Sequence, residues 1–134
     1  MGSKYYKHFN PNPRGLEIGD CVIRALCAVT DKSWYDIFDI ICKHARDNAI
    51  MPNESLRKFV EQRMSLFGLR LVKLAKPNKG EKCYTVSRFC KEHNKGKYIL
   101  NVANHEIAIV DGHYYDIYPC WDNSRVYSYY EFKS

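Results

Sequence analysis

One of the six cysteines in the sequence stands where a thiol would be reactive. Cys21 follows Asp20 in the segment GDCVIRAL, at the start of an apolar pattern with helical spacing. Asp20 is a typical N-cap, so Cys21 takes the first helical position. A cysteine there lies at the positive end of the helix dipole, which lowers the thiol pKa and favours the nucleophilic thiolate. The spacing indicates a nucleophile, and a buried structural thiol is the alternative interpretation.

A histidine and an aspartate far along the chain are expected to lie side by side. The segment NHEIAIVDGHYYDIY predicts a hairpin, because Asp111-Gly112 suits a two-residue turn in which both central residues have positive φ. With that turn, Asp116 lies opposite Ile107 and becomes a diagonal neighbour of His105 on the same face. A shift of one residue would move Asp116 to the other face. An imidazole oriented by a carboxylate is the base that a cysteine nucleophile needs.

The sequence around the other histidines, cysteines and candidate carboxylates predicts where each of them lies. We expect the remaining histidines at the surface or at the turn: His8, His44, His93 and His113. Three cysteines fall in helical patterns and two in loops: Cys27, Cys42 and Cys90, then Cys83 and Cys120. The segment PCWDNS offers Asp122 and Asn123 as alternatives to Asp116, since a longer turn would bring them to the imidazole. Trp121 in that segment either lines a substrate groove or closes the edge of the core.

The elements that position these residues change in character along the chain. Apolar residues with helical spacing predict three helices, from 21, from 34, and over 54–66. Alternating and apolar runs then predict strands, with one short helix, capped by Thr85, among them: 69–74, 97–102, 105–110, 113–118 and 125–132. Helices followed by antiparallel strands favour an α+β domain, with a helical half packed on a sheet half.

Length and composition limit the classes of protein to consider. With 134 residues, 46% of them hydrophobic, the chain fits one domain over 1–134, in which 1–16 form an extended lead-in. No apolar run is long enough to span a membrane, and no secretory signal is visible, so we expect a cytoplasmic protein with reduced thiols. The net charge is +6, but the basic residues are dispersed, so we expect no nucleic-acid partner. The cysteine spacing predicts no metal site, and we expect no cofactor.

The two ends of the sequence resemble the papain-like cysteine peptidase superfamily. The resemblance rests on GDCVIRAL with its helix and on YILNVANHEIAIVDGHYYDIYP, over roughly residues 17–30 and 85–118. The segments are similar to those of peptidase domains of bacteriocin exporters, effector cysteine proteases and small bacterial and phage proteins. The resemblance implies a compact papain-like fold, with Cys21 as nucleophile, His105 as base and Asp116 as orienting residue.

The resemblance also implies a donor for the oxyanion, and here the sequence departs from the family pattern. Papain-like enzymes usually place a glutamine a few residues before the cysteine, whereas the only glutamine of this chain is Gln62. Asn10, Asn12 and Arg14 are the candidates to replace it, and Asn12 is our choice. The interval from Cys21 to His105 is also short for the family, which implies a minimal version of the fold.

The expected function is acyl transfer through a cysteine thiolate, with a protein or peptide as substrate. Peptide-bond hydrolysis is the default reaction, and deamidation or transamidation of a glutamine side chain uses the same three residues. The alternative is a papain-like binding module without catalysis, which docks on another protein. The sequence indicates neither the substrate nor the oligomeric state.

Overall fold

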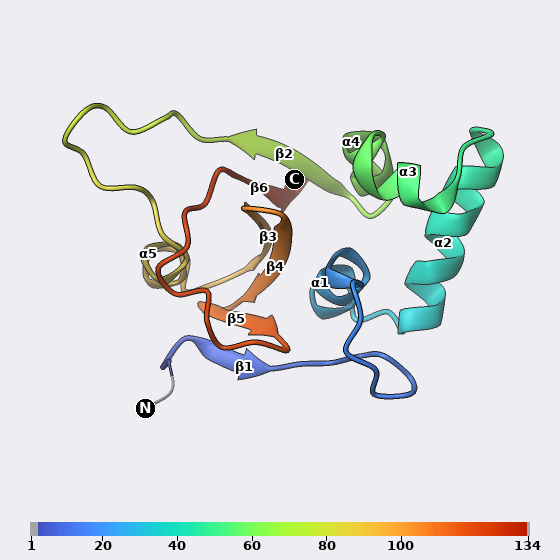
Figure 1. Ribbon diagram of the computed structural model, residues 1–134, viewed down its shortest axis with the longest axis horizontal. Helices are drawn as coiled ribbons and strands as arrows, with labels where there is room; N and C mark the ends of the chain where they lie inside the picture. The colour runs from blue at the N-terminus through green and yellow to red at the C-terminus, as the bar shows by residue number, and fades with distance from the viewer. Residues whose placement is uncertain (1–2, 134) are drawn as a thin grey trace.

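A six-stranded sheet lies at the centre of the protein, whose structure is a computed structural model that describes residues 3–133. The strands are β1 (Tyr6–His8), β2 (Leu69–Lys73), β3 (Lys97–Val102), β4 (His105–Val110), β5 (His113–Asp116) and β6 (Ser128–Phe132). They lie in the order β1-β5-β4-β3-β6-β2 (Figure 1). β1 pairs parallel to β5, and the other pairs within the described residues are antiparallel.

The described part of the chain contains five helices. They are α1 (Cys21–Thr30), α2 (Trp34–Asp47), α3 (Pro52–Arg57), α4 (Val60–Ser65) and α5 (Val86–Glu92). Figure 1 shows α1 between the sheet and α2, with α3 and α4 above α1, between β2 and α2, whereas α5 lies at the other side of the sheet. The predicted α+β class is therefore confirmed. No helix within residues 3–133 is both long and apolar enough to cross a membrane.

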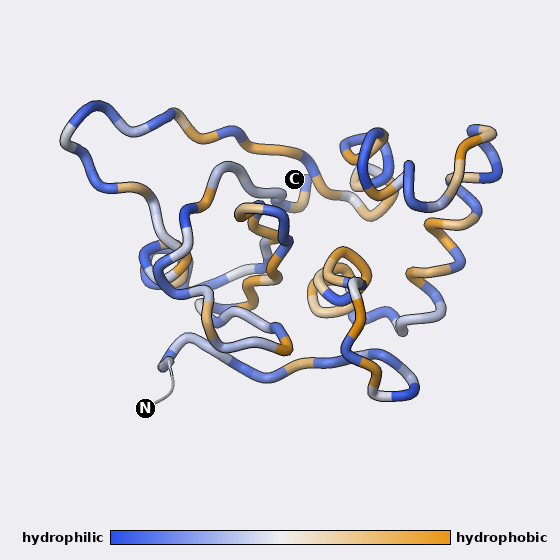
Figure 2. The backbone as a smooth tube through the Cα atoms, in the orientation of Figure 1, coloured by the Kyte–Doolittle hydropathy of each residue, from blue (hydrophilic) through white to orange (hydrophobic). Residues whose placement is uncertain are grey.

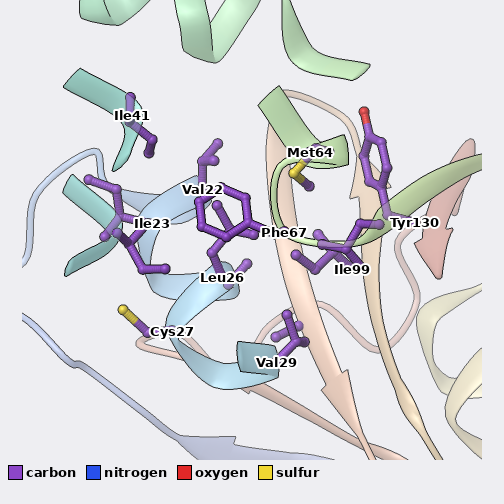
Figure 3. Close-up of a cluster of buried hydrophobic side chains, with 14 residues drawn as sticks. Val22, Ile23, Leu26, Cys27, Val29, Ile41, Met64, Phe67, Ile99 and Tyr130 are labelled. Atoms are coloured by element: carbon purple, nitrogen blue, oxygen red, sulfur yellow. The ribbon is translucent and has the colours of Figure 1, made fainter. Parts of the chain in front are cut away.

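Two apolar cores hold the helices on the two faces of the sheet. Helix α1 buries the predicted stripe of Val22, Leu26 and Val29 against residues of the sheet and of α2 and α4, among them Ile99, Tyr130, Ile41 and Met64 (Figure 3). The opposite face packs on Phe89 of α5 through another buried set: Leu100, Ile107, Ile109 and Tyr114. Apolar residues gather on α1 and the central strands, and the loop between β2 and α5 is mostly hydrophilic (Figure 2).

The β4–β5 hairpin has the register that its turn predicts. Val110 pairs with His113, and Ala108 pairs with Tyr115, so the turn consists of the two residues 111 and 112. Asp111 and Gly112 both have positive φ, 47° and 80°. The carbonyl oxygen and Cα of neighbouring residues lie 3.1 Å from the position of a Cβ on Gly112, so this turn has no room for a side chain there. The hairpin therefore fixes which residues share a face at the open ends of its strands.

The structure differs from the expectations in three places. The lead-in expected over 1–16 contains β1, which extends the sheet beside β5; residues 1 and 2 lie outside the described residues. The helix expected over 54–66 is divided into α3 and α4, because the backbone at Phe59 has φ −107° and ψ 37°. Helix α1 begins at Cys21 as expected, but the side chain of Asp20 makes no capping hydrogen bond.

Candidate active site

His105 lies between the two residues that the sequence proposed as its partners. It is the first residue of β4, and its Nε2 lies 3.0 Å from Oδ2 of Asp116 at the end of β5. The Cys21 thiol, at the N-terminus of α1, lies close enough to the ring to raise its pKa, and both residues line one pocket. The three residues are therefore neighbours in the order cysteine, histidine, aspartate.

The charges of this arrangement favour a protonated histidine. Burial of the ring opposes its charged form, but the hydrogen bonds to Asp116 and Cys21, with their negative charges, raise the pKa of His105 to about 9. Burial acts against ionisation of Asp116 as well; the hydrogen bond from His105 and the charges of His105 and Arg24 nevertheless hold its pKa below the ordinary value. At neutral pH the site therefore contains an imidazolium between a carboxylate and the thiol group.

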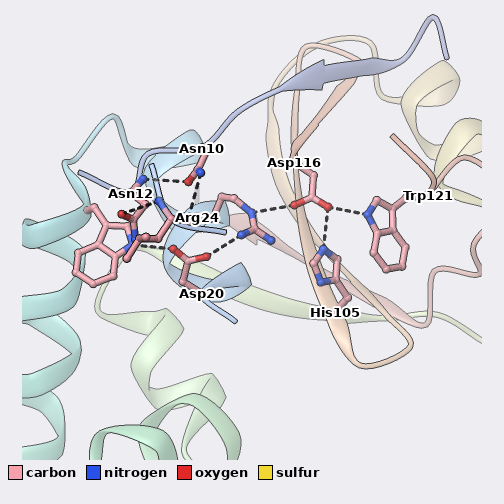
Figure 4. A network of polar contacts seen from close by, with 9 residues as sticks. Asn10, Asn12, Asp20, Arg24, His105, Asp116 and Trp121 are labelled. Atoms are coloured by element: carbon pink, nitrogen blue, oxygen red, sulfur yellow. Dashed lines mark hydrogen bonds and ion pairs between the residues drawn. The ribbon is translucent and has the colours of Figure 1, made fainter. Parts of the chain in front are cut away.

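The carboxylate of Asp116 is buried and receives three hydrogen bonds. Besides His105, the donors are Arg24 Nε at 2.8 Å and Trp121 Nε1 at 2.6 Å (Figure 4). A carboxylate bound by several donors is held in one orientation and stays ionised. Asp116 is thus suited to orient the imidazole of His105 and to stabilise its charge.

Arg24 connects this carboxylate to the start of helix α1. Its Nη1 donates to Oδ1 of Asp20 at 2.7 Å, and the other oxygen of Asp20 accepts from Trp34 Nε1 at 2.9 Å. Arg24, Asp20 and Asp116 are all buried. Sequence reasoning missed Arg24, although its position four residues after Asp20 on a buried helix was a usable signal. This network fixes the helix that carries Cys21 relative to the strand that carries Asp116.

Trp121 forms a lid over the histidine. Its indole ring stacks on the imidazole of His105, with ring centroids 4.3 Å apart and an interplanar angle of 9°. Its indole nitrogen donates to Asp116 at the same time. The sequence left open whether Trp121 lines a substrate groove or closes the edge of the core. The structure shows that it contacts the catalytic candidates His105 and Asp116. The stack shields one face of the imidazole from solvent.

The other candidates for the site lie elsewhere. Asp122 accepts hydrogen bonds from Tyr114 and Ser3, at 2.6 and 2.7 Å, and Asn123 is exposed. Asn12 orders the loop before α1, because its Oδ1 accepts from the backbone nitrogens of Arg14 and Leu16. Figure 4 shows it on the far side of Asp20 and Arg24 from His105. The assignment of Asn12 as the oxyanion donor stays a prediction.

The histidine expected at the surface of α2 is buried instead. His44 is 5% exposed; its Nδ1 lies 2.8 Å from Ser55 Oγ and its Nε2 lies 3.2 Å from Gln62 Oε1. The prediction for His44 was therefore wrong, and its spacing of three residues from buried Ile41 was the signal that it lies on the inner face. Gln62, the only glutamine, is engaged here rather than beside Cys21.

A pocket of about 570 Å³ opens beside Cys21 and His105. Its walls come from the start of α1, from α3, and from the turn between β3 and β4, and its polar residues include Asn53, Arg57, Asn101, Asn104 and Glu106. The β3–β4 turn comprises two residues, with Val102 paired to His105. The candidate nucleophile therefore faces a concave space large enough for an amino-acid side chain.

The six cysteines lie within residues 3–133 and are free thiols in different surroundings. Burial raises the pKa of the Cys27 thiol to about 11 and that of Cys90 to about 12. Cys42 is half-buried, and Cys83 and Cys120 are exposed. Cys21 is half-buried, and it is the cysteine that lies near the imidazole of His105.

Comparison with protein-family models, curated proteins and solved structures finds no match for this chain. Within residues 3–133, no group of three or more histidine, cysteine, aspartate or glutamate side chains is placed to hold a metal ion. The chemistry of the site must accordingly be argued from the geometry of its own side chains.

Proposed function

We propose that this protein is a papain-like cysteine hydrolase that transfers acyl groups through Cys21. The observation that carries the proposal is the position of His105, which lines one pocket with Cys21 and also binds the buried carboxylate of Asp116. Structural histidines seldom combine a thiol partner, an oriented carboxylate and an adjoining pocket, whereas nucleophilic catalysis by cysteine needs all of these. Six free thiols further support action in a reducing compartment such as the cytoplasm.

The proposed reaction has two halves, formation of a thioester and its hydrolysis, and all three residues act in both. The Cys21 thiolate attacks the acyl carbon, and the imidazolium of His105 gives its proton to the leaving amine, which departs and leaves a thioester. Neutral His105 then takes a proton from water as it attacks the thioester, and the acid and the Cys21 thiolate are released. Asp116 holds the ring in one tautomer throughout. The unpaired backbone N–H groups in the first turn of α1 are candidates to stabilise the oxyanion.

Peptide-bond hydrolysis is the default reaction, with a protein or peptide as substrate. Deamidation or transamidation of a glutamine side chain proceeds through the same thioester and differs only in the leaving and accepting groups. The two reactions are distinguished by their products. Hydrolysis of the main chain yields two shorter peptides, and deamidation yields ammonia with the chain intact.

A papain-like binding module without catalysis is the second candidate. The observation that favours it is that Asn10 and Asn12, the side-chain amides considered for the oxyanion, do not line the pocket, and that Asn10 Nδ2 donates to the carbonyl oxygen of Leu16. Loss of one oxyanion donor costs about 3 kcal/mol of transition-state stabilisation. In such a module the contact between Cys21 and His105 would persist as a remnant without turnover.

Selective alkylation tests the proposed nucleophile without any knowledge of the substrate. Iodoacetamide at neutral pH is expected to modify Cys21 at least about tenfold faster than exposed Cys83 and Cys120, as measured by mass spectrometry of peptides. His105→Ala should remove this advantage, because the imidazolium no longer stabilises the thiolate. His113→Ala, at the start of β5 in the same hairpin, is the matched control and should leave it unchanged. Labelling of Cys21 no faster than Cys83 would contradict the proposal.

A further inference from the structure

Glu106 lines the pocket beside Cys21 with a carboxyl group that lacks a partner. It follows His105 in β4, and its Oε1 is sealed from solvent without a hydrogen bond to any residue that the structure describes. Burial raises the pKa of Glu106, although the charges of Arg63 and His105 oppose the change. A carboxylate oxygen buried without a donor is destabilised, and a bound cation would supply the interaction that it lacks.

No residue of the described protein supplies that cation at contact distance. Arg63 is the nearest candidate, since it is fully buried and its charge acts on Glu106. Its Nε donates to the carbonyl oxygen of Ser55 and its Nη1 to the sulfur of Met64, while Nη2 has no partner. Arg63 and Glu106 thus form no ion pair with each other. The basic residues of the pocket wall are His105 and Arg57, and Arg57 is exposed on α3.

We propose that Glu106 determines the substrate class of this pocket by binding a cationic side chain, lysine or arginine, beside the acyl group that Cys21 attacks. The inference rests on the proposed function, because it places the substrate by the position of the nucleophile. An ammonium or guanidinium would give the carboxylate of Glu106 the charge-assisted hydrogen bond that the protein lacks. The neighbouring amides of Asn53, Asn101 and Asn104 offer further oxygens in the same wall.

Charged thiol reagents test the preference directly. We would compare methanethiosulfonates of similar size that carry an ammonium, a sulfonate or no charge; each forms a mixed disulfide with the thiolate and releases methanesulfinate. The measured quantity is the rate for the ammonium reagent at Cys21 divided by the rate for the neutral reagent. Division by the neutral rate removes any change in the thiolate fraction. In Glu106→Gln this ratio is expected to fall about tenfold, and in Glu81→Gln, an equal charge change in a distant loop, to stay constant.

A competition experiment on the unchanged protein gives an independent result that does not require the variant to fold. N-acetyl-arginine amide and N-acetyl-lysine amide should slow the neutral reagent at Cys21, and N-acetyl-norleucine amide at the same concentration should not. Two outcomes would overturn the role of Glu106 but not the proposed function, provided that Cys21 is labelled fast. One is a ratio of ammonium to neutral rates in Glu106→Gln equal to that of the unchanged protein, and the other is equal protection by N-acetyl-norleucine amide. Labelling of Cys21 no faster than Cys83 with all three reagents would overturn the proposed function, and this inference with it.

Discussion

His105 is the residue whose surroundings determine most of the chemistry of the site. An ordinary histidine is mostly neutral at physiological pH, but this one lies between a carboxylate and a thiol, and its pKa is about 9. The ring therefore stores the proton that a leaving amine needs. The same pKa shift makes the fold itself depend on pH, because the unfolded chain has no such partners.

The free energy of unfolding is expected to fall as the pH rises from about 6.5 to about 9. Below that range the folded and unfolded chains both hold the His105 proton, and the stabilisation is complete. Within it the unfolded chain loses the proton first, so the contribution declines and is lost above the folded pKa. Urea unfolding at a series of pH values should show a decline of roughly 1–3 kcal/mol. His105→Gln should lack this decline, and an identical pH dependence in that variant would contradict the assignment.

Single residues were predictable where their neighbours in sequence determine their place. Cys21 begins a helix because the pattern after it is helical, and that was visible. Partners from distant elements were not visible. Arg24 is bound by Asp116, 92 positions later, and His44 is buried by Ser55 and Gln62 of other helices. Local spacing held a signal for an inner face at both positions, although His44 was expected at the surface. Only the tertiary structure supplies the partners that make a buried charge or imidazole tolerable.

At the scale of elements, the β4–β5 hairpin was predictable and the edge strand β1 was not. A turn of two residues with positive φ leaves one register, and that register brings His105 to Asp116. Strand β1 has three residues and pairs only at an edge, so its sequence carries too little alternation to mark it. The break between α3 and α4 has no glycine or proline; α3 packs on α2 and α4 on β2, so tertiary packing divides the helix.

Gly112→Ala is expected to lower the free energy of unfolding by about 1–2 kcal/mol. The new Cβ would lie 3.1 Å from the backbone of Cys90 and Asn94, at a φ of 80° that alanine rarely adopts. Denaturant titration measures the change. Gly80→Ala is the matched control, because Gly80 also has positive φ, 89°, but open space around it. An equal loss in both variants would show that strain, rather than close packing of the turn, limits this position.

At the scale of the whole molecule, the site lies where the helical half meets the sheet. Helix α1 packs against β3, β4 and β5, and it contributes the nucleophile, whereas the sheet contributes the base and its carboxylate. Arg24 is the ionic connection between them, with Asp20 on its own helix and Asp116 on the sheet. Catalytic geometry and the docking of the two halves therefore depend on the same buried guanidinium.

Arg24→Met is expected to destabilise the protein by about 3–5 kcal/mol, since it leaves the buried carboxylate of Asp20 without its cation and removes one of the two cations bound to Asp116. The same variant should slow the alkylation of Cys21, because the helix loses its connection to Asp116. Urea unfolding and labelling rates measure the two effects. Arg88→Met provides the comparison: its ion pair with Glu92 is exposed, and its loss should cost less than about 1 kcal/mol. Similar losses from Arg24 and Arg88 would refute a structural role for the buried pair.

The stacking of Trp121 on His105 has an optical consequence. A protonated imidazole in contact with an indole ring is an effective quencher of its fluorescence, and a neutral one quenches less. The two rings are 4.3 Å apart and nearly parallel, so the emission of Trp121 reports whether the histidine carries its proton. The protein thus contains a built-in fluorophore at the centre of its chemistry, whose brightening near pH 9 would follow the ionisation of His105 without any added dye.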